Sequence, residues 1–203
     1  MRSGANQRVA YFGYGSLVNQ ATLRTGFVDI FPASLGGWRR HWQGRTMAAR
    51  TIGEDMPDLS LLSVHRDDGC AIQGAMVVDL LENLPAVDER ESGYQRVALS
   101  RDRVTVPPDV TLPDELYVYV ADVPEAEVGG EFLLQSYLDA VMQGFHRLYG
   151  PHGVQHFVET TKGFERPVIQ DRNTPVYPRS VILNDGEAEL FDAALRSVGV
   201  RFG

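Results

Sequence analysis

The chain has 203 residues, of which 43% are apolar and 23% are charged, and its formal net charge at pH 7 is −8. This length suits one domain with a sizeable core, and the acidic balance argues against a general nucleic-acid binder, which needs a basic face. No apolar run approaches the roughly 20 residues that span a bilayer, and residues 1–8 lack the apolar centre of a secretory signal. We therefore expect a soluble cytoplasmic protein that binds neither nucleic acid nor membrane.

The residues that hold metals in other proteins are sparse in this chain. Cys70 is the single cysteine, so it has no partner for an internal disulfide or a thiolate metal cluster. His152 and His156 lie four residues apart, but the glycines and the proline in residues 150–153 make a regular helix there unexpected. Since no Glu or Cys is arranged around these histidines, we predict no metal site.

The first predicted element is a buried strand over Val9–Phe12, which ends in a Gly-Tyr-Gly-Ser segment at residues 13–16. Glycines at this place let the backbone turn tightly and bring its N–H groups close to a ligand. The residues Tyr14–Leu17 therefore form a candidate binding loop. Asn19 is the predicted N-cap of a short helical turn that runs to Arg24.

Strand signals dominate the middle of the chain and helical signals dominate its end. Further strands are predicted over residues 27–35, 38–42, 59–64, 71–80, 94–100, 116–120 and 180–183. Residues 65–69 carry turn chemistry, which predicts a hairpin between the strands on either side. Helices are predicted over residues 81–90, 132–149 and 187–198, with Gly150-Pro151 ending the long one. This order predicts an α+β fold with a mainly antiparallel, strongly curved sheet.

An acidic segment ends the helix predicted over residues 81–90. It reads Asp88-Glu89-Arg90-Glu91, and Gly93-Tyr94 follow before the next strand. Acidic side chains at a helix end are usually solvated, and we expect this for Glu82, Asp88 and Glu89.

Together, these features resemble the gamma-glutamylcyclotransferase superfamily, including its ChaC-like and AIG2-like branches. Members carry a Tyr-Gly-Ser-(Leu or Asn) loop directly after the first strand, and residues 12–17 match its ChaC-like form. Members also carry an acidic segment that ends in a glutamate shortly before a strand, and residues 88–94 match it. Gln135-Ser136-Tyr137 is a weaker match, at a place where relatives often carry a ligand-contacting tyrosine. The resemblance covers roughly Val9 to Tyr149, and its first two motifs are specific only in combination.

The resemblance implies a small curved mixed sheet or barrel with flanking helices, in a single domain over residues 1–203. It also implies a cofactor-independent γ-glutamylcyclotransferase that releases 5-oxoproline and an amine or peptide from a small-molecule γ-glutamyl substrate. Glutathione and γ-glutamyl amino acids are the substrates considered. Glu91 occupies the family's acid/base position, and Tyr137 becomes a substrate contact. The implied substrate cradle is Tyr14, Gly15, Ser16 and Leu17.

Two residue-level alternatives accompany this hypothesis. Ser16 is not predicted to be a nucleophile, because Leu17 and Val18 replace the second glycine of a Gly-x-Ser-x-Gly elbow. Tyr137 lies on an amphipathic helix, where a tyrosine is as often packed in the core with its hydroxyl bonded.

The chain departs from the family pattern in two places. Val18-Asn19 replaces a tryptophan that ChaC-like proteins commonly carry, and a C-terminal extension begins at about residue 151. Within it, residues 171–179 are rich in Arg, Asp and Pro, a composition typical of a rigid loop held by ion pairs. This loop covers the site, recognises the group beyond the γ-glutamyl bond, or serves as a surface extension or a homodimer contact. Two functional alternatives stay open: a γ-glutamylamine cyclotransferase and a non-catalytic binding module.

Overall fold

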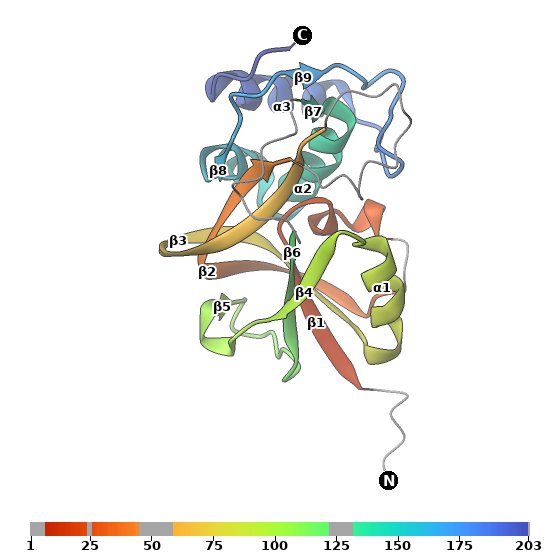
Figure 1. Ribbon diagram of the computed structural model, residues 1–203, viewed down its shortest axis with the longest axis vertical. Coiled ribbons are helices and arrows are strands. Elements are labelled where there is room, and N and C mark those ends of the chain that lie inside the picture. The colour runs from red at the N-terminus through yellow and green to blue at the C-terminus, as the bar shows by residue number, and fades with distance from the viewer. Residues whose placement is uncertain (1–6, 24–25, 45–58, 122–131, 203) are drawn as a thin grey trace.

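The computed structural model describes residues 7–23, 26–44, 59–121 and 132–202. Within these residues the main sheet has seven strands, in the order β4-β6-β1-β3-β2-β5, with β8 paired to β2 (Figure 1). The pairing is mixed, because β1 runs antiparallel to β3 and parallel to β6. The predicted α+β fold is confirmed. The sheet is open and does not close into a barrel, since the edge strands β4 and β5 do not pair with each other.

The strands of the main sheet are β1 (Arg8–Gly13), β2 (Asp29–Gln43), β3 (Leu61–Leu80), β4 (Tyr94–Ala98), β5 (Val104–Thr105), β6 (Leu116–Ala121) and β8 (Thr161–Lys162). A small second sheet pairs β7 (Leu133–Leu134) with β9 (Val168–Ile169). The helices are α1 (Leu84–Arg90), α2 (Gln135–Glu159) and α3 (Asp185–Ser197). No helix in the described part of the chain has the length and apolar character needed to cross a membrane.

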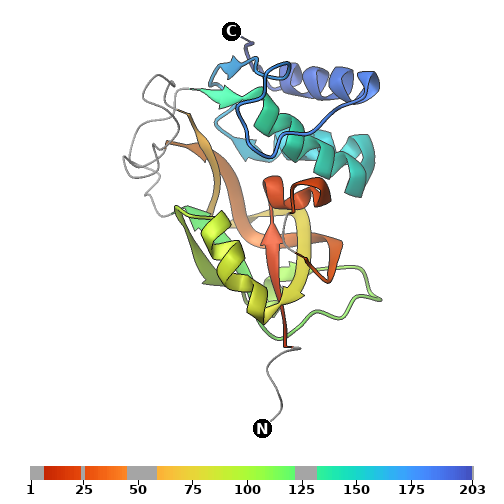
Figure 2. The same ribbon diagram turned by 90° about the vertical axis from the view of Figure 1, so that its right-hand side faces the viewer.

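The central strand β1 is covered on both faces, which explains its continuous apolar sequence. Ala10 and Phe12 belong to a large core cluster that includes side chains of α2, and Val9 and Tyr11 belong to a second cluster that includes α1. Figure 2 shows α2 and α3 together at the end of the sheet toward which β1 runs, with α1 against the sheet. The carboxyl end of β1 therefore points toward α2 and α3.

The predicted hairpin at residues 65–69 is wrong. β3 is one strand, and both of its halves pair with β2 rather than with each other. The register shifts between the pairs Gly36↔Ala71 and Trp38↔Arg66, so residues 67–70 lie opposite Gly37. Gly37 has a φ of 78°, which a glycine adopts without strain. The turn-forming residues are accommodated as a bulge, and the strands predicted over residues 27–35 and 38–42 become one.

Two predictions near the C-terminus also need correction. The helix α2 breaks at Gly150, whose φ is 67°, but a second helical stretch begins at Pro151 and places both His152 and His156 on a helix. Residues 180–183 are not a strand. They lead into Asn184, whose side chain accepts a hydrogen bond from the Glu187 N–H and begins α3.

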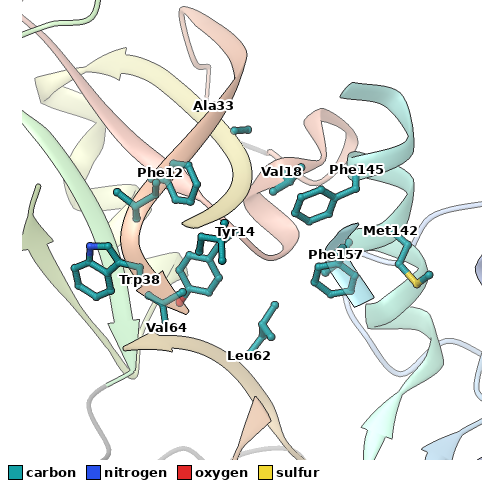
Figure 3. Close-up of a cluster of buried hydrophobic side chains, with 14 of the residues drawn as sticks. Phe12, Tyr14, Val18, Ala33, Trp38, Leu62, Val64, Met142, Phe145 and Phe157 are labelled. Atoms are coloured by element: carbon teal, nitrogen blue, oxygen red, sulfur yellow. The ribbon is translucent and has the colours of Figure 1, made fainter. Parts of the chain in front are cut away.

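The core between the sheet and α2 is rich in aromatic side chains. Figure 3 shows Phe12, Tyr14 and Trp38 on the sheet side, with Phe145 and Phe157 on the helix side. These five side chains are at most 6% exposed. This packing fixes the distance between the end of β1 and α2.

Gly74 of β3 has no room for a side chain. A Cβ there would overlap the Gly13 carbonyl oxygen and would lie 2.5 Å from the Phe12 ring. We expect Gly74→Ala to lower the free energy of unfolding by about 1–3 kcal/mol, because β1 has to move. Gly69→Ala is the matched control on the same strand, since its nearest neighbour would lie at 3.5 Å. Urea denaturation of both variants checks this, and equal losses of stability would contradict it.

Candidate functional site

The segment after β1 forms two short 3₁₀ turns, Ser16–Val18 and Gln20–Thr22. The Asn19 side chain accepts a hydrogen bond from the Ala21 N–H at 3.0 Å, which confirms the predicted N-cap. Its amide also donates to the Ala140 carbonyl oxygen of α2 at 2.8 Å. The turn ends at Thr22, and Arg24 lies outside the described residues. The candidate loop is therefore anchored on α2.

The four residues of the candidate loop differ in how far they are exposed to solvent. Tyr14 is buried, and its hydroxyl donates to the Tyr119 carbonyl oxygen at 2.7 Å. Leu17 packs in the core cluster beside α1. Gly15 is also buried, whereas Ser16 is partly exposed. The side chains of Tyr14 and Leu17 thus build the core, and a ligand would meet the Ser16 side chain or the backbone of the loop.

Glu91 is the C-cap residue of α1, and its N–H donates to the Val87 carbonyl oxygen at 2.9 Å. Its side chain is only 15% exposed, whereas Glu82, Asp88 and Glu89 are exposed, as expected for solvated acids. The acidic segment therefore contains one carboxyl group that is mostly removed from water.

Arg90 connects this carboxyl group with the loop. Its Nε donates to Glu91 Oε1 at 2.9 Å, and its side chain is 7% exposed. The same guanidinium donates to the Thr22 carbonyl oxygen at 2.9 Å and reaches Ser16 Oγ at 3.5 Å. Glu91 and the segment after β1 are thus held together by one buried cation.

Burial raises the pKa of the Glu91 carboxyl above its usual value, because the charged form is desolvated. The charges of Arg90 and Arg179 oppose this effect, and so does the hydrogen bond from Arg90. A carboxyl group with a raised pKa in a partly enclosed place is suited to accept and return a proton.

Tyr137 lies in the first turn of α2 and reaches the loop. A Cβ on Gly15 would lie 2.8 Å from the Tyr137 hydroxyl oxygen, so only a glycine permits this approach. Burial raises the pKa of Tyr137 well above its usual value, and the neighbouring Tyr94, Tyr177 and Glu91 raise it further. A hydrogen bond from the Ser16 N–H opposes the shift. The Tyr137 hydroxyl therefore keeps its proton at neutral pH.

A cavity of about 180 Å³ lies beside Tyr137. Its walls come from β3, β4, the start of α2 and the segment Val176–Arg179. Among the predicted site residues, Tyr137 lines this cavity, whereas Glu91 and residues 14–17 do not. Because the charge of Arg179 acts on Glu91, the cavity wall lies within electrostatic range of the buried carboxyl group.

The segment that forms this wall is fastened to α2 at two points. Asp171 accepts hydrogen bonds from the Ser136 N–H at 2.8 Å and from the Val176 N–H at 2.9 Å. Arg172 donates to both carboxylate oxygens of Asp139 at 2.8 Å and to Asp192 of α3 at 2.7 Å. The sequence predicts no individual role for Asp171 or Arg172, although the Arg, Asp and Pro content of residues 171–179 indicates a loop held by ion pairs.

No family model matches the chain, and no curated protein does. Among solved structures, it is similar to a gamma-glutamyl cyclotransferase with a TM-score of 0.53 and 15% identity, over 92% of this chain and 99% of that one. An uncharacterized human protein gives a TM-score of 0.54 with 15% identity over the same shares. YkqA from Bacillus subtilis gives 0.51 with 18% identity, over 77% of this chain and 56% of that one. The chain therefore has the gamma-glutamyl cyclotransferase fold.

The contact between Gly15 and Tyr137 predicts a coupling between the two positions. We expect Gly15→Ala to lower the free energy of unfolding by about 1–3 kcal/mol, because the new methyl group collides with the tyrosine hydroxyl. In a Tyr137→Phe background the same substitution should cost at least about 0.5 kcal/mol less. A double-mutant cycle by chemical denaturation measures this, and strictly additive effects would show that the two residues do not touch.

The raised pKa of Glu91 predicts a pH-dependent effect of Glu91→Gln on stability. A carboxyl group whose pKa is raised in the folded state stabilises that state below its unfolded pKa, and this contribution is lost as pH rises through the folded pKa. The variant should therefore gain stability relative to the wild type between pH 4 and pH 7. Denaturant titrations at the two pH values test the sign, and a relative loss over this interval would mean that the pKa is not raised.

Proposed function

We propose that this protein is a γ-glutamylcyclotransferase, which closes the γ-glutamyl group of a small molecule into 5-oxoproline and releases an amine or peptide. The observation that carries this proposal is the buried carboxyl group of Glu91, which Arg90 ties to the segment after β1. The shared fold supports the class of reaction. The residues involved are the ones that the sequence motifs single out.

The reaction needs a group that moves protons between two nitrogens. The substrate's α-amine is an ammonium at neutral pH, and it has to lose a proton before it attacks its own side-chain carbonyl carbon. The bond from the α-nitrogen to that carbon then forms, and the bond from the carbon to the leaving nitrogen breaks. Overall the α-nitrogen loses two protons and the leaving nitrogen gains two. We assign this transfer to Glu91, whose pKa is raised toward the useful range.

The remaining contribution is positioning. The attack is intramolecular, so a site that holds the substrate folded back on itself supplies much of the rate enhancement. Negative charge develops on the carbonyl oxygen, and we assign its stabilisation to backbone N–H groups of residues 15–17 and to the Tyr137 hydroxyl, which itself accepts a hydrogen bond from the Ser16 N–H. Because Tyr137 keeps its proton, it remains a donor throughout the reaction.

The test is 5-oxoproline formation by the purified full chain. The substrate panel contains glutathione, γ-glutamyl amino acids and γ-glutamylamines, with detection by mass spectrometry. We expect Glu91→Gln to lower kcat by about 10²- to 10⁴-fold, since it removes the proton acceptor. Glu89→Gln, an exposed acid two positions earlier, is the matched control and should keep full activity.

Two outcomes would contradict the proposal. If Glu91→Gln and the wild type turn over substrate equally, the carboxyl group is not the acid/base. If both proteins bind γ-glutamyl compounds and neither turns them over, the chain is a binding module on this fold.

A further inference from the structure

The cavity beside Tyr137 has a mainly apolar lining with two distinctive donors. Leu61, Leu62, Leu134 and Val176 contribute apolar surface. Arg179 and Tyr177, from the same short segment, also line the cavity and carry a guanidinium and a hydroxyl. A small apolar pocket with a few polar groups is typical of a site that orients one small ligand.

Within the described residues, neither of these donor groups has a hydrogen-bond partner. Arg179 is partly buried, and its guanidinium makes no hydrogen bond or ion pair with any residue in the described part of the chain. The Tyr177 hydroxyl is buried and also has no hydrogen-bond partner there. By contrast, the partly buried Arg172 is satisfied by two carboxylates. A buried donor without a partner costs stability, so these two are suited to a ligand that brings acceptors.

The part of this segment that carries Tyr177 is held in place before any ligand binds. The Tyr177 N–H donates to Ser136 Oγ at 3.2 Å, and the Tyr177 ring meets the Tyr137 ring edge-on with centroids 5.0 Å apart. The Val176 N–H donates to the Asp171 carboxylate, which also accepts from the Ser136 N–H at the start of α2. Because the segment is fastened on α2, little ordering is left for the ligand to impose.

We propose that this cavity binds the leaving part of the substrate, and that Arg179 and Tyr177 bind a carboxylate on it. The inference rests on the proposed function and names its substrate class: γ-glutamyl amino acids and peptides, in preference to γ-glutamylamines. A guanidinium with a neighbouring hydroxyl donor suits a carboxylate. The charge of Arg179 also lowers the pKa of Glu91, so the guanidinium lies within electrostatic range of the proposed acid/base.

A matched pair of substrates isolates the carboxylate. γ-Glutamylalanine and γ-glutamylethylamide differ by that one group, and the wild type should favour the first in kcat/KM by about 10- to 100-fold. In Arg179→Gln this ratio should fall toward one, mainly through KM for γ-glutamylalanine, and Tyr177→Phe should lower it less. Arg201→Gln, an exposed arginine in the same part of the chain, is the control that keeps the wild-type ratio.

A binding measurement separates this inference from the proposed function. Calorimetry in the Glu91→Gln protein compares the same two compounds without turnover, at pH 8. Preferential binding of γ-glutamylalanine that is lost in Arg179→Gln supports the carboxylate site even if no 5-oxoproline ever forms. A wild-type ratio near one, or equal losses on both compounds in Arg179→Gln, would overturn it. Equal losses would mean that Arg179 binds the γ-glutamyl group itself.

Discussion

The removal of the Glu91 carboxyl group from water, next to the Arg90 guanidinium, is the constraint around which the site is organised. Burial favours the neutral acid and Arg90 favours the carboxylate, and burial is the stronger of the two. Arg90 also bonds the Thr22 carbonyl oxygen, so the cation that opposes the pKa shift fastens the segment after β1. Local charge balance and loop position are therefore set by the same side chain.

The second organising contact is between the loop and α2. Gly15 leaves room for Tyr137, and Asn19 bonds the backbone of the same helix. Since Asp171 and Arg172 fasten the C-terminal segment to α2 as well, this helix positions both the loop and the cavity wall. Within the described residues the buried Tyr177 hydroxyl has no hydrogen-bond partner, which is a cost to stability of the kind often found at functional sites.

Sequence reasoning succeeded where the signal is local. The apolar run of β1, the glycines after it and the acidic end of α1 are each predicted from neighbouring residues. In the structure Arg90 binds Glu91 and reaches Ser16 Oγ at 3.5 Å, and the charge of Glu91 acts on Tyr137. It failed where strand pairing overrides local turn chemistry. Residues 65–69 of β3 look like a turn, but pairing with β2 holds this part of the strand as a bulge. Tyr177 and Arg179 were not identified because their place beside Tyr137 depends on contacts across distant parts of the chain.

The most direct measurement is a crystal structure of the protein with bound 5-oxoproline. The lactam carbonyl oxygen should lie within hydrogen-bond distance of the backbone N–H groups of residues 15–17 or the Tyr137 hydroxyl, and the ring nitrogen should face the Glu91 carboxyl group. If 5-oxoproline binds elsewhere, or if the Glu91 side chain points away from it into solvent, Glu91 cannot transfer the protons and the proposed chemistry is wrong.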